Sequence, residues 1–299
     1  MAKKTQRYPN ILKNCGGESN KLNKILELKI KKLANKSRIL TMKMFHESRQ
    51  GGHLGGCFSS AEILTVLYNG ILKIDPKNTG WKLRDHFVLS KGHISGMFAS
   101  VLFLKGFFGE DFLATYDEIN SAFGMHTTIH IPGCEFAAGS LGHGLSFAVG
   151  IALGKKIEKI KSRVFVLMGD GELNEGSVWE AAMSANKWKL DNLIAIVDRN
   201  MCNMEGLTEN IMPLDPLEDK WRSFGWSVKT VNGHSISDLY EILHSIPFKV
   251  NNPSLIIANT VKGKGLSSFE GDYKCHYVQI DEQKYNENLE ELKKYESFT

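Results

Sequence analysis

The most constraining feature of the sequence is a series of short apolar runs that alternate with helical patterns. The runs VFVLM (164–168) and LIAIVD (193–198) are separated by a helical pattern over about 177–188. FVLS (87–90), WSVKTVNG and SLIIANTV are also strand-like, and the helical pattern SDLYEILHSI lies between the last two. Strands that are apolar along their whole length are typical of parallel sheets covered by helices on both faces. The sequence therefore predicts an α/β fold with a doubly wound, mostly parallel sheet.

The remainder of the chain predicts further helices and one long loop. Apolar spacing indicates a long or kinked helix over about 19–49. Ser59 and Glu62 have the spacing of a capping box at the start of the next helix. Residues 106–138 have no regular pattern, and we expect a long functional loop there. The glycine-rich GSLGHG (139–144) opens another helix.

Composition and charge limit the class of protein. Residues 1–18 are polar and predict a flexible arm, whereas no Pro/Gly/Ser-rich linker divides 19–299, which we expect to form a single domain. The net charge of +4 is too small to indicate a nucleic-acid partner. No apolar run has the 18 or so residues of a membrane span, and no signal peptide is evident. The five cysteines are scattered and form no C-x-x-C pair, which favours reduced thiols and a cytoplasmic location.

A lone carboxylate between two glycines ends the run VFVLM, in the sequence Gly169-Asp170-Gly171. Open parallel sheets bind ligands outside the carboxyl ends of their strands. Asn200 follows the next apolar run, 30 residues later, so Asp170 and Asn200 meet if the two strands are neighbours. A carboxylate and an amide oxygen form an incomplete site of the kind that Mg²⁺ occupies together with substrate phosphates. We expect a diphosphate held through a metal, with the N–H of Gly171 facing a phosphate.

The glycine-rich segments also admit other interpretations. A GDG sequence at a strand end is typical of a simple tight turn as well. The segment GSLGHG has the order G-x-x-G-x-G and no clear preceding strand, so it does not match a dinucleotide fingerprint. The phosphate-loop sequence GK[ST] is absent, which argues against a nucleoside triphosphatase.

Longer segments resemble one enzyme family. GDGELNEGSVWEAAMSANKWKLDNLIAIVDRN, followed by MCNMEG, is similar to the thiamin-diphosphate signature. SRQGGHLGG, RDHFVLSKGH and PGCEFAAGSLGHGLSFAVGIALG resemble three segments of transketolases, and VKGKGLSSFEGDYKCHY resembles the one that closes their cofactor domain. These segments keep the family's order over roughly residues 20–280. They resemble the diphosphate-binding domain alone, which implies the N-terminal subunit of a split transketolase.

The resemblance implies a role for individual residues. Asp170 and Asn200 match metal ligands, and Cys202 falls where the family uses a backbone carbonyl. The implied cofactors are thiamin diphosphate and Mg²⁺, for which Ca²⁺ or Mn²⁺ substitutes. The residues implied for cofactor binding are His93, Gly139, Ser140, Leu141, Gly171, Asn200 and His276. The residues implied for catalysis are His53, His93, His126, His276 and Glu175.

The family's reaction explains the histidines. A transketolase moves a two-carbon ketol unit from a ketose phosphate to an aldose, so hydroxyl and carbonyl oxygens lose and gain protons. Imidazole titrates near neutral pH and suits this work. The pyrimidine-binding and C-terminal domains are expected on a second chain, with two copies of each chain in a heterotetramer. Sugar phosphates are the expected substrates, and neither nucleic acid nor membrane is an expected partner.

Two acidic residues and three departures from the family pattern leave questions open. Glu175 matches an acid at the subunit interface, whereas Glu180 fits either that interface or a capping box with Ser177. Leu54 replaces a usual proline, MHTTIH replaces a His-Pro-acid sequence, and His143 replaces a usual glutamine. These changes lie on the substrate side, so the alternatives include a carboligase for an unusual sugar or a synthase of the deoxyxylulose-phosphate type. A non-catalytic scaffold subunit is the alternative from another class.

Overall fold

The structure, a computed structural model, describes residues 22–48 and 50–297, so the arm predicted over 1–18 lies outside the described residues. Within them, five parallel strands form one sheet in the order β1-β2-β3-β5-β4. The strands are β1 (His86–Leu89), β2 (Val164–Gly169), β3 (Leu193–Arg199), β4 (Ser227–Asn232) and β5 (Ser254–Asn259). The predicted doubly wound α/β fold is confirmed.

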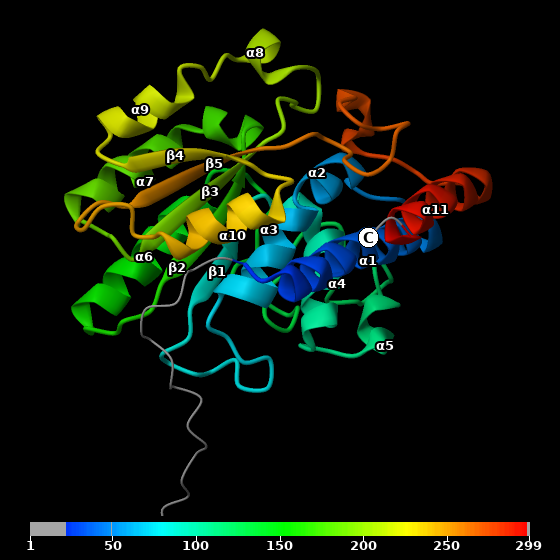
Figure 1. Cartoon of the computed structure of the whole chain (residues 1–299), viewed down its shortest axis with the longest axis horizontal. Helices are drawn as coiled ribbons and strands as arrows, with labels where there is room; N and C mark the ends of the chain where they lie inside the picture. Colours follow the sequence, from blue (N-terminus) through cyan, green and yellow to red (C-terminus); the bar gives the residue numbers. More distant parts are fainter. Residues whose placement is uncertain (1–21, 49, 298–299) are drawn as a thin grey trace, which may run out of the picture.

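Helices cover both faces of the sheet (Figure 1). One face packs against α6 and α7, and the other packs against α1, α3, α4 and α10. The α-helices are α1 (Lys24–Glu47), α2 (Leu54–Ser59), α3 (Ala61–Val66), α4 (Ser95–Lys105), α5 (Glu110–Leu113), α6 (Gly144–Ile157), α7 (Gly176–Lys187), α8 (Thr208–Ile211), α9 (Leu217–Ser223), α10 (Ile236–His244) and α11 (Glu282–Ser297). Short helical turns of other types are Leu67–Ile71, Gly92–Ile94, Gly171–Asn174 and Tyr273–His276.

Alternate residues of the strands enter two separate apolar cores. In β2, Phe165 and Leu167 pack on the side of α1 and α4, whereas Val164 and Val166 pack on the side of α6 and α7. Successive side chains of a strand point to opposite faces, so a strand covered on both faces is apolar at every position. Every residue of β2 and β3 is buried, which explains their continuous apolar runs. The edge strand β4 is partly exposed along its length.

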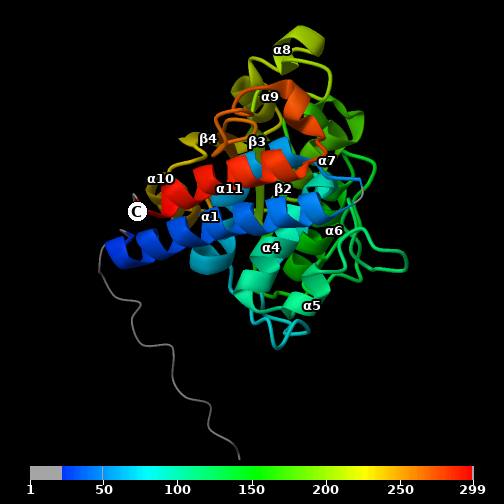
Figure 2. The ribbon, with the colours of Figure 1, turned by 90° about the vertical axis from the view of Figure 1, so that its right-hand side faces the viewer.

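The first and last described helices lie side by side (Figure 2). Asn23 begins α1, where its side chain accepts a hydrogen bond from the N–H of Leu26 at 2.7 Å. The Asn35 amide of α1 donates to the carbonyl of Leu292 in α11 at 2.9 Å, and Leu292 is fully buried. In the described parts of the chain, no helix is both long and apolar enough to cross a membrane.

The capping box predicted for Ser59 and Glu62 is wrong. Ser59 is the last residue of α2, and its hydroxyl donates to the buried Asp198 carboxylate at 2.6 Å. The Glu62 carboxylate forms a buried ion pair with Arg38 at 2.6 Å and a hydrogen bond with His234 at 2.9 Å. A buried carboxylate must be paired with a charge or several donors, so partners distant in sequence take the place of the local cap.

Candidate active site

A cavity of about 300 Å³ lies at the carboxyl ends of the strands. Strands β2 and β3 are parallel neighbours with Gly169 opposite Asp198, so Asp170 and Asn200 leave the sheet side by side. The predicted metal site required these two strands to be neighbours in the sheet, and they are. The predicted site residues that line the cavity are His53, His93, His126, Gly139, Leu141, Asp170, Gly171, Asn200, Cys202 and His276.

Four donors hold the Asp170 carboxylate in place. The N–H groups of Met201 and Gly171 donate to it at 2.7 and 2.8 Å, and the Thr208 hydroxyl and the Arg199 guanidinium lie at 3.3 Å. The side chain is only 2% exposed. A carboxylate fixed by several donors keeps its orientation when a ligand binds.

The electrostatic surroundings of Asp170 affect the binding of a cation. Burial, and then the nearby Asp198 carboxylate, raise the pKa of Asp170, although Arg199 and backbone N–H groups oppose this shift. Two neighbouring buried acids disfavour one another's charged forms, and a divalent cation between or beside them removes that penalty. A cation beside Asp170 would reduce that penalty, although Arg199 and Lys91 already pair with the two carboxylates.

The side-chain oxygens of two asparagines complete this side of the cavity. The Asn200 oxygen accepts the N–H of Cys202 at 3.1 Å, while its amide nitrogen lies 3.4 Å from Asp198. The Asn203 Oδ1 is buried and has no hydrogen-bond partner within the described residues. A Cβ on Gly171 would lie 2.4 Å from this oxygen, so only glycine permits the close approach of Asn203.

These groups fit a cation that is shared with a diphosphate. A hard cation such as Mg²⁺ takes one or two protein oxygens and completes its octahedron with phosphate oxygens and water. Asp170, Asn200 and the unpartnered oxygen of Asn203 are of this kind. Across the described ranges, no group of three or more His, Cys, Asp or Glu side chains could hold a metal by itself.

Four imidazoles form a cluster on the other side of the cavity. The His53 ring lies 5.3 Å from His93, 5.5 Å from His126 and 5.3 Å from His276, and His93 lies 5.6 Å from His276, measured between ring centroids. They come from the start of α2, the turn after β1, the loop before residue 127 and the turn Tyr273–His276. The predicted histidines therefore lie together, although they are distant in sequence.

Crowding keeps these histidines neutral. Burial, and then the nearby His126 and Lys262, lower the pKa of His53 to about 4. Burial and Lys262 likewise lower the pKa of His276 to about 3, and burial and neighbouring positive groups place the pKa of His93 well below its usual value. A neutral imidazole offers one donor and one acceptor. The buried His53 Nδ1 has no hydrogen-bond partner among the described residues.

A buried ion pair beneath the histidines was missed in the sequence. The Lys91 ammonium pairs with Asp198, and their side chains are 1% and 0% exposed. Asp198 also accepts hydrogen bonds from the hydroxyls of Ser59, Ser60 and Thr260. Burial alone would raise the pKa of Asp198, but Lys91 and these hydroxyls hold it below its usual value. Lys91 follows Ser90 just after the end of β1, and its local sequence does not indicate that it is buried or that it meets Asp198.

Two further lining residues were also missed. The Lys262 ammonium donates to the carbonyl of Asn203 at 2.8 Å and lies 3.2 Å from the Nδ1 of His276. Lys262 therefore connects Asn203 with the histidine side of the cavity. The buried Glu172 accepts the N–H groups of Gly142 at 2.9 Å and Gly169 at 3.1 Å, which ties the glycine-rich segment to β2.

Ser140 and Glu175 are the predicted site residues that do not line the cavity. Both are exposed, and Glu175 begins α7 without a side-chain capping bond. The capping box considered for Ser177 and Glu180 is wrong, because the Ser177 hydroxyl donates to the carbonyl of Gly142 at 3.0 Å. Glu180 is exposed on α7.

The fold and site define a class of protein: an α/β cofactor domain that binds a diphosphate at the ends of parallel strands. The family described as transketolase, thiamine diphosphate binding domain, matches residues 29–298. The chain therefore belongs to the transketolase family. The predicted family, the thiamin diphosphate cofactor and the enzyme class, a transketolase-type transferase, are confirmed.

Individual relatives agree with this family. One subunit of the apulose-4-phosphate transketolase of Phocaeicola vulgatus is 40% identical over 259 residues, which are 87% of this chain and 92% of the relative. The 6-deoxy-6-sulfo-D-fructose transketolase subunit SqwG of a Clostridium species is 40% identical over 244 residues, 81% of this chain and 89% of the relative. The crystal structure of transketolase from Campylobacter jejuni matches with a TM-score of 0.82 and 32% identity over 90% of this chain. This chain spans only 43% of that larger protein.

Proposed function

We propose that this chain is the cofactor-binding subunit of a split transketolase, which transfers a two-carbon ketol unit from a ketose phosphate to an aldose. The observation that carries the proposal is one cavity in which Asp170 and Asn200 lie opposite a cluster of neutral imidazoles. The similarity to relatives named as transketolase subunits of comparable length supports the division into two chains.

In this proposal each group of residues has a separate task. Asp170, Asn200 and the backbone carbonyl of Cys202 bind Mg²⁺, with Ca²⁺ or Mn²⁺ as substitutes. Gly171 and the segment 139–141 lie along the cofactor. The buried and unpartnered oxygen of Asn203, beside Gly171, supports this assignment.

When bound, thiamin diphosphate supplies the carbon nucleophile that breaks the C2–C3 bond of the ketose. The chain's own contribution is proton transfer and orientation. His53, His93, His126 and His276 bind the hydroxyl and carbonyl oxygens of the sugar, and the unpartnered Nδ1 of His53 is available for such a bond. A neutral imidazole offers one donor and one acceptor, so each of these side chains can orient a sugar oxygen and exchange a proton with it.

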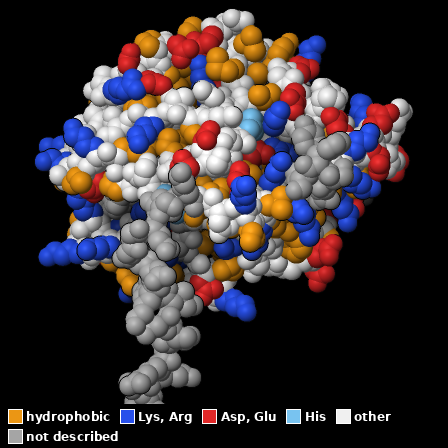
Figure 3. Space-filling view, in the orientation of Figure 1, with side chains coloured by type: hydrophobic (Ala, Val, Ile, Leu, Met, Phe, Trp, Pro, Cys, Tyr) orange, Lys and Arg blue, Asp and Glu red, His pale blue; other side chains and the backbone are white. Residues whose placement is uncertain are grey.

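The proposal includes a second chain that covers the cavity. Exposed hydrophobic side chains lie around α8, at the top of Figure 3, and one exposed residue before α8, Met204, lines the cavity. The residues of this exposed patch are Met201, Met204, Leu207, Ile211 and Met212. Contiguous exposed apolar surface is typical of a protein interface. We propose two copies of each chain, with Glu175 and Glu180 at an interface, a single domain over 19–299, and a cytoplasmic location, which the free cysteines support.

The donor sugar is proposed to be an unusual ketose. Two residues that depart from the family pattern are next to residues that line the cavity: Leu54, fully buried at the start of α2, follows His53, and His143, at the start of α6, lies two residues after Leu141. The relatives act, by their names, on apulose 4-phosphate and 6-deoxy-6-sulfofructose. A related carboligase or synthase reaction would use the same cofactor site. A measurement of which donor sugars the assembled pair accepts distinguishes these reactions.

Reconstitution tests the proposal. The purified chain is mixed with a chain that carries the pyrimidine-binding and C-terminal domains, preferably the product of an adjacent gene. Two-carbon transfer is measured from xylulose 5-phosphate, apulose 4-phosphate and 6-deoxy-6-sulfofructose. We expect activity from the mixture and none from either chain alone. Full activity from this chain alone would contradict the split arrangement, and cofactor binding without transfer from any donor would favour a scaffold.

A further inference from the structure

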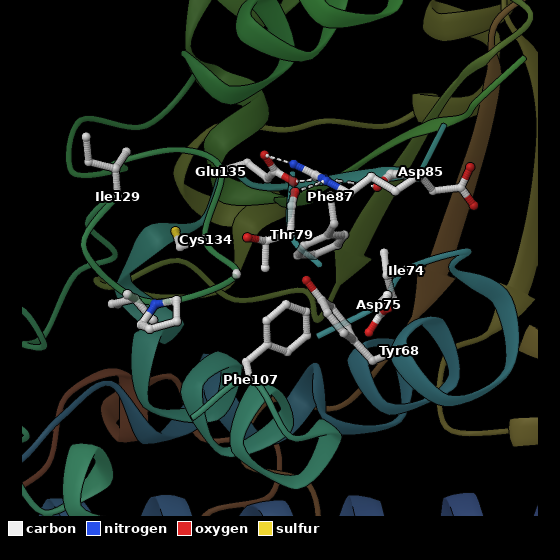
Figure 4. Close-up of a pocket in the computed structure, with 14 residues that line it drawn as sticks. Tyr68, Ile74, Asp75, Thr79, Asp85, Phe87, Phe107, Ile129, Cys134 and Glu135 are labelled. Atoms are coloured by element: carbon white, nitrogen blue, oxygen red, sulfur yellow. Dashed lines mark hydrogen bonds and ion pairs between the residues drawn. The ribbon is translucent and has the colours of Figure 1, made fainter. Parts of the chain in front are cut away.

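A second cavity, of about 280 Å³, lies at the amino end of β1, whereas the candidate active site lies at the carboxyl ends of the strands. It lies between the segment 74–85 and the segment 129–135 (Figure 4). The segment 129–135 connects His126 to Gly139, which both line the active-site cavity. The second cavity is therefore separate from the active-site cavity. However, the segment 129–135, which forms part of its wall, belongs to the loop that joins two residues of the active-site cavity.

Three aromatic rings form one side of this cavity. The Tyr68 ring lies 5.6 Å from Phe87 and 6.2 Å from Phe107 between centroids, and both pairs are edge to face. Tyr68 belongs to the π-helical turn Leu67–Ile71, a type of turn that is rare and frequent at functional sites. Because aromatic pairs favour edge-to-face and offset-stacked geometries, these rings can also accommodate the ring of a ligand.

The Tyr68 hydroxyl has no partner. Tyr68 is 3% exposed, and its hydroxyl points into the cavity (Figure 4). Among the residues that the structure describes, none forms a hydrogen bond with it. Burial, and then the nearby Glu135 carboxylate, raise the pKa of Tyr68 well above its usual value, so the hydroxyl remains a donor. The hydroxyl is accessible from the cavity, so a ligand with an acceptor can take the place of solvent as its partner.

The charged groups of the cavity do not favour an anion. Arg84 donates to both carboxylate oxygens of Glu135, the second at 3.0 Å, and Arg163 pairs with Asp85 at 2.6 Å. Asp75 adds a negative charge at the exposed rim. The Arg84 guanidinium is thus already paired, and the negative rim repels carboxylates and phosphates.

We propose that this cavity binds a small, uncharged, planar aromatic molecule that carries a hydrogen-bond acceptor. The ring lies against Phe87 and Phe107, and the acceptor receives the hydrogen bond of the Tyr68 hydroxyl. The volume suits a single ring with one substituent. The bound molecule contacts the segment 129–135.

Benzamide is a suitable probe, because it combines a planar ring with a neutral carbonyl acceptor. The full chain is titrated, and the backbone amide signals of Phe87, Gly133 and Glu135 are followed by NMR. We expect saturable shifts with a dissociation constant in the millimolar range, as for other ligands of about ten heavy atoms. Benzoate tests the exclusion of anions and cyclohexanecarboxamide tests the need for planarity, and each should bind at least about tenfold more weakly.

Variants locate the binding. Tyr68→Phe removes the donor and should weaken benzamide binding about fivefold without loss of stability, since the hydroxyl has no protein partner. Thr79→Trp places a large side chain in the exposed mouth and should abolish binding. Asn78→Trp is the matched control, because Asn78 is exposed and does not line the cavity.

Three results would overturn the proposal. One is the absence of saturable shifts at about 10 mM benzamide. Another is unchanged binding by Thr79→Trp, which would locate the ligand elsewhere. The third is binding of benzoate as tightly as benzamide, which would exclude the proposed preference for an uncharged ring. Thermal denaturation of each variant shows that lost binding does not reflect lost folding.

Discussion

Replacing Lys91 with methionine would leave the buried Asp198 carboxylate without its cation. The two groups are almost wholly buried, and Asp198 also accepts bonds from three hydroxyls, those of Ser59, Ser60 and Thr260. Methionine matches the length of lysine, so the substitution removes charge while it keeps most of the packing. The change therefore isolates the electrostatic contribution of the pair.

The expected cost follows from this arrangement. Removal of one partner from a buried ion pair typically destabilises a protein by about 3–5 kcal/mol. The three remaining hydroxyl donors still solvate Asp198, so we expect a loss near the lower end, about 3 kcal/mol. In the double variant Lys91→Met with Asp198→Asn, no unpaired charge remains. The double variant should therefore be more stable than Lys91→Met, with a coupling energy of at least about 2 kcal/mol.

Urea denaturation of the wild type, both single variants and the double variant measures this coupling. With an m-value of about 3 kcal/mol/M, the Lys91→Met midpoint should fall by about 1 M. If Lys91→Met lowers the free energy of unfolding by less than about 1 kcal/mol, the reasoning is refuted, because the buried ion pair would then contribute no more than an exposed ion pair. Additive effects of the two substitutions would refute it as well.

The other predictions concern the cavity itself. His53 has a pKa lowered to about 4, so the unfolded chain binds more protons between about pH 6.5 and 4, and stability should fall as the pH drops through that window. His53→Asn should reduce this loss in thermal denaturation; an unchanged pH profile would contradict the shift. Asp170→Asn should abolish Mg²⁺-dependent binding of thiamin diphosphate by the reconstituted pair while circular dichroism shows a folded chain, whereas undiminished binding would contradict the metal assignment. Gly171→Ala should displace Asn203 and weaken cofactor binding at least about tenfold, since the added Cβ lies 2.4 Å from its oxygen. Gly176→Ala, whose Cβ meets nothing within 4 Å, is its control, and equal effects of the two substitutions would exclude the steric explanation.

The strands and the proximity of Asp170 to Asn200 could be predicted because their causes are local. A strand buried on both faces must be largely apolar. Asp170 and Asn200 each come directly after such a strand. Their proximity required only that β2 and β3 be neighbours. The histidines are different, because they come from four separate segments, and only the resemblance to a family indicated that they meet.

Other features depend on tertiary contacts that local patterns do not contain. A lysine after a strand is ordinarily exposed, so the burial of Lys91 beside Asp198 could not be inferred from either segment alone. The capping-box spacing of Ser59 and Glu62 was misleading, because both side chains bond to distant residues. Helix α11 has a largely polar sequence and is held through its contact with α1, where Leu292 is buried.

Metal-dependent transfer by the reconstituted pair tests the central claim most directly. Two-carbon transfer is measured for wild-type chain and for Asp170→Asn, each mixed with the partner, with Mg²⁺ and with a chelator. The account predicts activity only for the wild-type mixture with a divalent cation, and a loss of at least about 100-fold for Asp170→Asn. Equal rates for wild type and Asp170→Asn would contradict it, because the Asp170 carboxylate would then not hold the cofactor's metal.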